Sequence, residues 1–492
     1  MTALFRSITA ITAALAAAGA AQAAPSFVNG LTIAASTGDQ FGTLVNDGRL
    51  GMFSDLYYDR TRNEWWGLSD RGPGGGTLSY ETRVQRFTLD VDPLTGAISN
   101  FQVAQTIKFS SSGQALNGLA PANPGVLGTS FDPEGFVINP RNGHLLVSDE
   151  YGPSVYEFDR SGSLVRSYAA PANLVPQVGG ATNYTANAAT LTSGREGNRG
   201  LEGLAISPDG RFAYAMLQNG TVTDGTLNGS SLGRSMYARI VQYDTGSGAA
   251  VAQYAYRLDG AGPAPAQGRG ISAIVALDDH RFMVLERNNR GVGVDANIAG
   301  GDKLVYTIDL AGATDVTGID LDAPLPAGYT AVTKSGTALL NLAAPATLAD
   351  SSLAALGGRA PEKWEGLAVG PQLQDGSYLL LAGTDNDYSV TQNGSNQQFD
   401  IYYNPSTGTR MQCDLGATSN CFSVSNGGSV GDTNLGDLPA GFALIPGVLQ
   451  AYKASANDLG GYTAPVPEPG TYALMLAGLA GVLALSRRRG AR

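Results

Sequence analysis

The chain contains few of the side chains that many hydrolytic and metal-dependent sites require. Among its 492 residues are two histidines, His144 and His280, and two cysteines. It has no H-E-x-x-H zinc motif, no P-loop and no dinucleotide-binding fingerprint. A G-x-S-x-G match surrounds Ser429, but both histidines precede it, whereas the α/β-hydrolase order needs a histidine after the serine. Chemistry in this chain would therefore depend on carboxylates, arginines and a metal ion.

Basic residues are also scarce. The chain has 31 Lys and Arg against 42 Asp and Glu, which gives a formal net charge of −11. Binding to nucleic acid needs patches of Lys and Arg that neutralise phosphates, so we expect no nucleic-acid partner. Glycine, in contrast, is abundant, with 66 residues, and this composition favours a turn-rich all-β fold.

The two cysteines, Cys413 and Cys421, lie close together in "CDLGATSNC". A metal site at this place would need further Cys or His residues nearby, and the sequence offers none there. Outside the cytoplasm, where thiols oxidise, we expect the two cysteines to form one loop-closing disulfide.

Residues 1–23 form a segment of their own, in which Arg6 precedes an apolar run that ends in small residues. This order is typical of a secretory signal peptide and favours cleavage after Ala23 over the alternative of a short buried helix. We therefore expect one domain to occupy residues 24–460.

The C-terminal segment, residues 465–492, has a Pro-Glu-Pro triplet, an apolar run from Tyr472 to Leu485 and then three arginines. The run is short for a bilayer span, which needs about 20 residues, and the arginines would stay cytoplasmic. On these grounds the segment is a marginal hydrophobic anchor helix at the C-terminus. Its order also closely resembles the PEP-CTERM sorting signal of Gram-negative bacteria. The resemblance implies processing by an exosortase and delivery to the cell surface or extracellular matrix.

One hairpin pattern recurs five times between these ends. Each copy has an apolar strand, a turn rich in Asn, Asp, Gly or Pro, and a second apolar strand; the copies occupy residues 51–72, 131–152, 199–220, 269–291 and 362–387. Third strands are expected at "SVYEFDR", "ARIVQYDT", "KLVYTIDL" and "QFDIYYN". Fourth strands are expected near "LVRSYAAP", "AVAQYAYRLD" and "VTKSGTALLNL".

Repeated four-stranded units predict a β-propeller. Five blades are clear, and the flanking segments 27–37 and 443–454 could supply closing strands or a further blade. The expected number is six, with five or seven left open. A β-sandwich is the alternative, but it does not explain five copies of one hairpin. The stretches 172–198, 219–236 and 388–437 are rich in Gly, Ser and Asn and are expected to be loops.

Polar residues recur at matching positions of the five hairpins. The first strands begin with Asp55, Glu134, Glu202, Ser272 and Glu365, and the second strands end with Asp70, Asp149, Gln218, Glu286 and Asp385. In an antiparallel hairpin these two positions lie side by side, so both sets should meet at one mouth of the propeller channel. The histidines lie at the hairpin tips, which is the opposite end.

Carboxylates crowded at one mouth repel unless a cation lies between them, and Ca²⁺ takes several oxygen ligands from flexible loops. We therefore predict a divalent metal, with calcium as the first choice, held by Glu134, Asp149, Glu202, Glu365 and Asp385. Arg71, Arg199 and Arg287, together with Glu150, are the predicted catalytic residues, because arginine forks grip phosphate and carboxylate groups. The alternative is that the acids only cap turns and pair with arginines between blades.

The segments "LSDRG", "DPEGF…SDEYG", "NRGLEGLA", "LER" and "WEGLA…DND" resemble the signature of the phytase-like domain family called "esterase-like activity of phytase". The resemblance covers about residues 28 to 455. It implies hydrolysis of phosphate or carboxylic esters on a propeller-like scaffold. A more distant likeness to β-propeller phytases and gluconolactonase-type propellers implies Ca²⁺ or a similar metal at the channel mouth. Gln218 and Ser272 depart from the acidic pattern.

These observations favour an exported, metal-assisted esterase or phosphoesterase acting on a small-molecule ester. It would reach the periplasm, cell surface or extracellular matrix, with a transient inner-membrane anchor before processing. Two alternatives stay open: a non-catalytic binding or structural propeller stabilised by calcium, and a lactonase.

Overall fold

The computed structural model describes residues 24–42, 48–186, 189–225, 235–259, 269–392, 395 and 397–465. The expected signal peptide and nearly all of the expected anchor segment lie outside these residues. Within them, no helix is long and apolar enough to cross a membrane. The helical elements described are short: α1 (Pro345–Leu348), η2 (Ser351–Leu356) and η3 (Asp387–Ser389).

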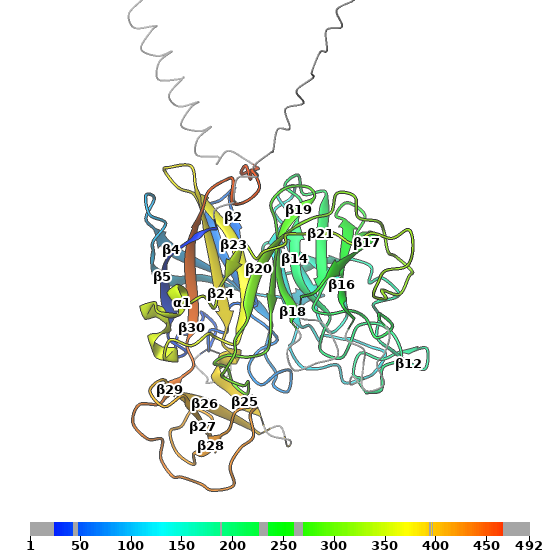
Figure 1. Cartoon of the computed structure of the whole chain (residues 1–492). Helices are drawn as coiled ribbons and strands as arrows, with labels where there is room; N and C mark the ends of the chain where they lie inside the picture. Colours follow the sequence, from blue (N-terminus) through cyan, green and yellow to red (C-terminus); the bar gives the residue numbers. More distant parts are fainter. Residues whose placement is uncertain are drawn as a thin grey trace, which may run out of the picture.

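The rest of the described chain is built from small antiparallel sheets, which agrees with the expected all-β class (Figure 1). The first sheet has the order β2 (Asp55–Asp59), β3 (Glu64–Leu68), β4 (Arg83–Val91) and β5 (Ile98–Lys108). The second has β8 (Pro133–Ile138), β9 (Leu145–Asp149), β10 (Val155–Phe158) and β11 (Leu164–Ser167). The third has β14 (Leu201–Ile206), β15 (Phe212–Leu217), β16 (Tyr237–Asp244) and β17 (Ala249–Arg257).

The fourth sheet contains β18 (Gly270–Ala276), β19 (Arg281–Arg287), β20 (Lys303–Asp309), β21 (Thr333–Lys334) and β22 (Leu340–Asn341). Short two-stranded sheets lie in the connections: β6 (Ser110–Ser111) with β7 (Gln114–Ala115), and β12 (Gln177–Val178) with β13 (Ala181–Thr182). The expected first, second and fourth strands are therefore confirmed in these sheets, and so are the third strands β10, β16 and β20. The loop expected at 172–198 contains one small hairpin.

The fifth sheet joins the two ends of the domain. It has the order β23 (Lys363–Gln372), β24 (Tyr378–Asp385), β30 (Gly447–Ala454) and β1 (Ser26–Ile33). The N-terminal strand pairs with the C-terminal one, with Leu31 opposite Leu449. The two flanking segments thus supply closing strands to this sheet and do not form a further sheet.

The first strands of the five sheets contact one another in a closed order. β2 packs against β8, β8 against β14, β14 against β18, β18 against β23, and β23 against β2 again. Apolar clusters fill the spaces between neighbouring sheets, for example around Phe136 and Trp66 between the first and second. The first strands therefore surround a common centre.

The segment 388–437, expected to be a loop, forms a sheet, and that expectation is wrong. It contains β25 (Val390–Gln392), β26 (Gln398–Asn404), β27 (Thr409–Asp414) and β28 (Phe422–Val424), with β29 (Ala443–Leu444) beside β26. The alternating segment "QFDIYYN" was expected as a third strand of the last repeat. Instead β30 takes the place beside β24, so β26 pairs with β25, β27 and β29 in a separate sheet, which Figure 1 shows below the others.

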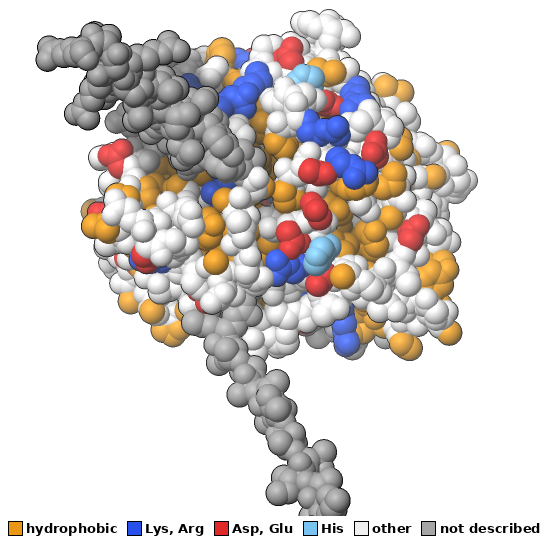
Figure 2. All heavy atoms as spheres, turned by 90° about the horizontal axis from the view of Figure 1, so that it is seen from above, with side chains coloured by type: hydrophobic (Ala, Val, Ile, Leu, Met, Phe, Trp, Pro, Cys, Tyr) orange, Lys and Arg blue, Asp and Glu red, His pale blue; other side chains and the backbone are white. Residues whose placement is uncertain are grey.

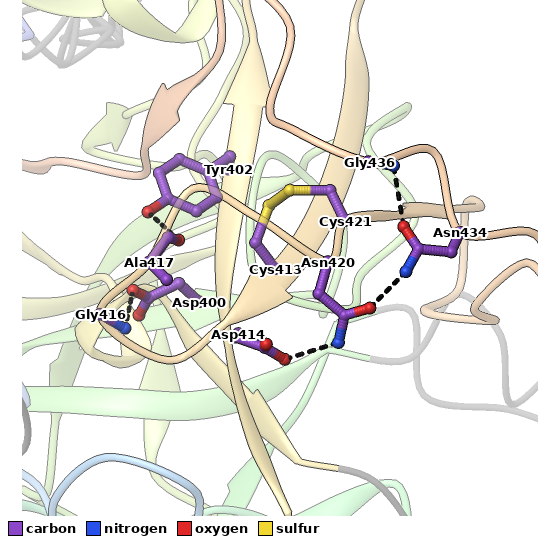
Figure 3. The surroundings of a disulfide bond; sticks show 10 residues. All are labelled: Asp400, Tyr402, Cys413, Asp414, Gly416, Ala417, Asn420, Cys421, Asn434 and Gly436. Carbon is purple, nitrogen blue, oxygen red and sulfur yellow. Dashed lines mark hydrogen bonds between the residues drawn. A yellow bond between two sulfur atoms is a disulfide. The ribbon is translucent and has the colours of Figure 1, made fainter.

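The disulfide predicted in this sheet is present. Cys413 and Cys421 are bonded and both are fully buried. Figure 3 shows the bond beside a chain of polar contacts in which Asn420 donates to Asp414 at 2.9 Å. The bridge closes a short loop that follows β27.

Candidate metal centre

A repeated irregularity in the first strands directs side chains out of the sheets. The pairing of β8, β14, β18 and β23 with its partner shifts at the position that carries Glu134, Glu202, Ser272 and Glu365, respectively. Such a bulge leaves one residue unpaired and turns its side chain away from the regular ladder. The sequence pattern Glu-Gly supports this geometry, because the following glycine lets the next strand approach closely. A Cβ on Gly135 would lie 2.6 Å from the backbone oxygen of Glu202.

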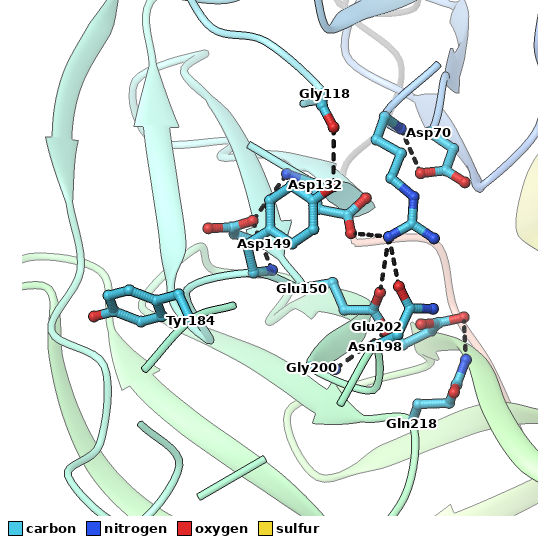
Figure 4. A network of polar contacts seen from close by, with 12 residues as sticks. Asp70, Gly118, Asp132, Asp149, Glu150, Tyr184, Asn198, Gly200, Glu202 and Gln218 are labelled. Atoms are coloured by element: carbon cyan, nitrogen blue, oxygen red, sulfur yellow. Dashed lines mark hydrogen bonds and ion pairs between the residues drawn. The ribbon is translucent and has the colours of Figure 1, made fainter. Parts of the chain in front are cut away.

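Three carboxylates converge where the first and second sheets meet. One oxygen each of Asp70, Asp132 and Glu134 lies within 4.8 Å of the others. Asp70 follows β3, and the other two lie at the start of β8. All three are buried, with 7%, 0% and 7% of their surface exposed. Figure 4 shows Asp132, Glu150 and Asn198 pointing toward the same place, with Asp70 nearby.

This group carries more negative charge than the surrounding residues neutralise. Burial raises the pKa of Glu134 well above its ordinary value, and Asp70, Glu202 and Asp132 raise it further. Its carboxylate forms no hydrogen bond or ion pair with any residue that the structure describes. Oδ1 of Asp132 is buried and also accepts no hydrogen bond.

Arg71 provides the nearest positive charge. Its Nη1 donates to Asp132 Oδ2 and to Asn198 Oδ1, each at 2.6 Å, and lies 3.7 Å from Glu150 Oε2. Burial lowers the pKa of Arg71, but Asp132, Asp70 and Glu150 outweigh it, so the net direction is upward. Arg71 thus neutralises one oxygen of Asp132 and leaves Glu134 without a partner.

A second group shares Asp70. It adds Asp385 and Asp387, with one oxygen of each within 4.8 Å of the others. Here Lys363 already supplies a cation, since its Nζ donates to Asp385 at 3.0 Å and to Asp387 at 2.7 Å. The two groups therefore differ: the one with Glu134 lacks a matching positive charge, and the one with Asp385 has it.

The group of Asp70, Asp132 and Glu134 fits a hard divalent cation. Carboxylate oxygens are the ligands that Ca²⁺ and Mg²⁺ prefer. A buried acid with no hydrogen bond is unfavourable unless it is protonated or a cation lies beside it. The unpartnered Glu134 carboxylate and the free Asp132 Oδ1 supply the oxygen atoms that such a cation needs.

Glu150, Glu202 and Glu365, which were also predicted, lie around the two acidic groups and belong to neither. Glu150 Oε1 accepts a hydrogen bond from the Gly200 amide at 3.2 Å. Glu202 accepts one from Gln218 at 3.2 Å (Figure 4), and burial together with Glu150 and Glu365 raises its pKa well above the ordinary value. Glu365 pairs with Arg287.

Asp149 does not join either group, and for this residue the turn-capping alternative describes the structure. Its carboxylate accepts hydrogen bonds from the backbone amides of Asp132 at 2.9 Å, Tyr151 at 3.1 Å and Gly152 at 2.9 Å. Burial raises its pKa to about 7 against the opposing effect of these amides. Asp149 thus shapes the loop that carries Glu150.

Two further acids of the aligned set are also held away from the group. Asp55 accepts hydrogen bonds from the amides of Phe136 at 2.8 Å and Leu56 at 2.7 Å, which ties β2 to β8. Glu286 is paired with Lys334 and accepts a hydrogen bond from Tyr256. The equal spacing of the repeats therefore did not give equal roles.

The predicted arginines divide between two places. Arg71 lies with the acidic group, whereas Arg199 and Arg287 line a separate pocket together with Arg269, which the sequence did not single out. In this pocket Ser272, at the position where other repeats have an acid, accepts a hydrogen bond from Arg287 Nε at 2.8 Å. Replacing the acid by serine leaves room for that guanidinium.

The histidines lie at the hairpin tips, as expected from the sequence. His144 Nδ1 is 2.7 Å from Glu157, and His280 Nδ1 is 2.8 Å from Asp309. Figure 2 shows histidines among Lys, Arg, Asp and Glu side chains on the face seen from above. Neither histidine belongs to the acidic groups.

The sequence analysis placed Asp70 among the converging acids but left it out of the predicted ligands, and the predicted site also lacked Asp132, Lys363 and Asp387. One signal could have found Asp132. It precedes Glu134 by two residues, and positions i and i+2 of an extended chain face the same side. The hairpin gave a signal for Lys363 as well, because the start of β23 pairs with the end of β24 and places Lys363 opposite Asp385.

Two family models match the chain. Residues 48–388 match the model described as "Esterase-like activity of phytase", and residues 465–489 match the "PEP-CTERM protein-sorting motif". Both resemblances drawn from the sequence are thus confirmed. The first match covers more than half of the chain.

The chain is also similar to one secreted protein, and it was compared with one solved structure. An "Uncharacterized secreted protein" of Arthroderma benhamiae is 29% identical over 227 residues, which cover 36% of this chain and 44% of the fungal protein. The chain therefore spans less than half the length of that relative. The structure of hydrazine synthase from Kuenenia stuttgartiensis is 11% identical and covers 79% of this chain and 99% of its own, with a TM-score of 0.27.

Proposed function

Since the chain belongs to the phytase-like family named for the esterase-like activity of phytase, we propose that it is an exported hydrolase of phosphate or carboxylic esters. The observation that carries the proposal is the buried group of Asp70, Asp132 and Glu134, in which Glu134 has no partner among the described residues. Such a group suits a metal ion that acts on an ester.

The scaffold proposed for this activity is a five-bladed β-propeller. The closed order of contacts among β2, β8, β14, β18 and β23 supports it. So does the pairing of β1 with β30, which joins the chain ends within one sheet. The sheet of β25 to β28 is an insertion between β24 and β30 and is not counted as a sixth blade.

The metal proposed is calcium, held by Asp70, Asp132 and Glu134. Ca²⁺ accepts irregular sets of carboxylate ligands supplied by loops and strand ends, and this group has that character. When bound, a divalent cation would polarise the ester and lower the pKa of a bound water. Glu202, Glu365 and Asp385, which we also predicted as ligands, would contribute negative charge around it.

Arg71 and Glu150 are the proposed catalytic side chains beside this group. Arg71 Nη1 holds Asp132 in place, and its guanidinium is available to stabilise charge that develops on the ester oxygens. Glu150 is tethered through Oε1 to the Gly200 amide, so Oε2 is the oxygen that would take the proton of the attacking water. Arg199 and Arg287 are too closely associated with their own pocket to be assigned to this step.

Export to the cell surface is supported by the PEP-CTERM motif and by the secreted relative. We propose an exosortase as the processing partner and a transient membrane anchor in residues 465–492. Pro465 and Tyr462 line the apolar channel beside the hairpin-tip residues Pro140 and Pro208. Pro465, the last residue that the structure describes, therefore lies at the hairpin tips, the end opposite the acidic group.

Purified protein tests the proposal on p-nitrophenyl phosphate, phytate and short acyl esters, with Ca²⁺ and with a chelator. We expect turnover of at least one substrate that the chelator abolishes and that Glu134→Gln lowers by about 100-fold or more. Arg211→Gln, at an exposed hairpin tip, serves as the control. Absence of metal-dependent turnover on all of them would reject the hydrolase.

The same experiment separates the two alternatives. A chelator that lowers the melting temperature while no ester is hydrolysed would favour a calcium-stabilised binding or structural protein. Turnover confined to lactones would identify a lactonase, and gluconolactone is therefore included among the substrates.

A further inference from the structure

A second pocket lies next to the acidic group and has the opposite chemistry. Its lining contains three arginines, three side-chain amides and one hydroxyl: Arg199, Arg269, Arg287, Gln218, Asn219, Asn289 and Ser272, with Gly270 and Ile271. No carboxylate is among these lining residues. Its volume is about 80 Å³, several times the roughly 10–15 Å³ needed to hold one water molecule. A small anion therefore has room in it.

The carboxylates that neutralise these arginines stand outside the pocket lining. Arg199 pairs with Glu196 at 3.1 Å, and Arg269 pairs with Asp302 at 2.6 Å. Arg287 pairs with Glu365. Each guanidinium is thus paired with an acid that does not line the pocket, while the lining itself offers hydrogen-bond donors.

The arginines are held too firmly to be ordinary surface residues. The side chains of Arg269 and Arg287 are 14% and 10% exposed. Arg199 Nη1 also donates to Asn219 Oδ1 at 3.1 Å. A bound anion would accept hydrogen bonds from guanidinium groups that line one small cavity.

Direct contacts link the pocket to the acidic group. Asn198, next to Arg199 in the chain, accepts the hydrogen bond from Arg71. Gln218, which lines the pocket, donates to Glu202, one of the acids that raise the pKa of Glu134. A molecule with two polar ends could therefore contact both places.

We propose that the pocket of Arg199, Arg269 and Arg287 binds an oxyanion, a phosphate or carboxylate, carried by the substrate in addition to its reacting ester. The assignment of this anion to the substrate rests on the proposed function, whereas anion binding by the pocket does not. Arginine forks match the oxygen atoms of both groups, and the amides of Asn219 and Asn289 add further donors.

Calorimetric titration of the full mature chain with inorganic phosphate, sulfate and acetate, in chelator at pH 7, tests the pocket without any catalysis. We expect binding of at least one anion and its weakening by about tenfold or more in Arg269→Gln. Arg211→Gln changes the net charge equally at a hairpin tip and should bind as the wild type does. Preference for phosphate over acetate, or the reverse, identifies which anionic group the pocket takes.

Because Arg269 also contacts the buried Glu286, its substitution could disturb the fold. Asn219→Asp provides the second variant, since it adds a negative charge to the pocket and keeps an acceptor for Arg199. It should abolish anion binding without changing the melting temperature in chelator by more than about 2 °C. No anion binding by the wild type, or equal affinities in Asn219→Asp and Arg211→Gln, would overturn the proposal. If no ester is hydrolysed, this measurement still decides the pocket, so the two proposals fail separately.

Discussion

Arg71 Nη1 lies 2.6 Å from Asp132 Oδ2, and the two side chains are only 13% and 0% exposed. Arg71 follows β3 and Asp132 precedes β8, so one ion pair joins the first and second sheets at the acidic group. Breaking such a pair leaves a buried charge without a partner. The same contact also limits how strongly the group attracts a cation, because it compensates part of the negative charge.

Arg71→Gln is expected to lower the free energy of unfolding by about 3 kcal/mol in chelator, because Asp132 then stays buried without its cation. The stabilisation by Ca²⁺ should be larger in this variant than in the wild type, because a positive charge has been removed from the group. Urea unfolding with chelator and with Ca²⁺ measures both effects. Arg62→Gln is the control, because the Arg62 side chain is 44% exposed and its partner Asp59 keeps the hydrogen bonds from Thr61; it should change stability by less than about 1 kcal/mol. Equal stability of the two variants would contradict a role for the buried pair.

The two acidic groups can be separated by one pair of variants. Glu134→Gln is expected to remove the increase in melting temperature that Ca²⁺ gives the wild type, because Glu134 is the ligand without a competing partner. Asp385→Asn should retain most of it, because Lys363 already neutralises that group. Thermal unfolding over a series of Ca²⁺ concentrations measures the shift. Loss of the Ca²⁺ effect in Asp385→Asn alone would move the metal to the other group.

Because the first strands pack closely, we expect one added methyl group between β8 and β14 to lower the free energy of unfolding. Gly135→Ala would place a Cβ 2.6 Å from the backbone oxygen of Glu202 and the backbone nitrogen of Leu204, so β8 and β14 would have to move apart. We expect a loss of about 2–3 kcal/mol. Gly336→Ala, where nothing lies within 4 Å of the added atom, should stay within about 0.5 kcal/mol of the wild type. Chemical unfolding of both variants gives the comparison, and equal stabilities would show that the strands are not in tight contact.

The pH dependence of stability can be tested at Glu157, far from the acidic group. Burial alone raises its pKa, but hydrogen bonds from Arg166 and His144 outweigh it, so the pKa falls below the ordinary 4.5. A group whose folded pKa is depressed adds stability above its unfolded pKa and loses it as the pH falls. Glu157→Gln should therefore cost about 2 kcal/mol at pH 7, and the difference should shrink below about pH 4.5.

The control for this pH series is Glu81→Gln. The Glu81 side chain is 42% exposed, and the substitution removes its ion pair with Lys108. Its effect should stay below about 1 kcal/mol. Unfolding free energies of the wild type and both variants, measured between pH 3 and pH 8, test this pH dependence. A difference between Glu157→Gln and the wild type that grows as the pH falls would contradict the predicted sign.

The disulfide is expected to stabilise the inserted sheet and not the ring of five sheets. Cys413→Ser with Cys421→Ser opens a short loop, and loop-closure entropy gives an expected loss of about 2–3 kcal/mol in that sheet. Limited proteolysis should cut the double variant faster within residues 414–437, while its Ca²⁺ response stays at the wild-type level. A changed Ca²⁺ response would show that the inserted sheet supports the acidic group.

Much of the fold could be read from the sequence because the repeats are local. Each hairpin needs only a few adjacent residues to define its strands and turn, and the five copies emerged from apolar periodicity. The failure at residues 388–437 has a physical cause. "QFDIYYN" has the alternation of a strand, but alternation does not say which strand it pairs with, and β30, distant in sequence, took the place beside β24.

The candidate site was predictable in its residue types and only partly in its members. Alignment of the repeats led to Glu134, Glu202, Glu365 and Asp385, and all of them lie near one another or near an oppositely charged partner. It also included Asp149, whose carboxylate binds three backbone amides, and it omitted Asp132 from the ligands. A shared position fixes the end of the hairpin at which a residue lies, but not the direction of its side chain or its hydrogen-bond partners.

The sequence by itself determined the all-β class, the repeated hairpins, the disulfide, the family and the end of each hairpin where the acids lie. These features depend on composition, periodicity and short motifs within single segments. The tertiary structure decided how the acids are shared out. Arg71 reaches Asp132, Lys363 reaches Asp385 and Asp387, and Glu134 is left without a partner. Lys363 and its two acids belong to one hairpin, but Arg71 and Asp132 come from different sheets, and burial brings their charges together beside Glu134.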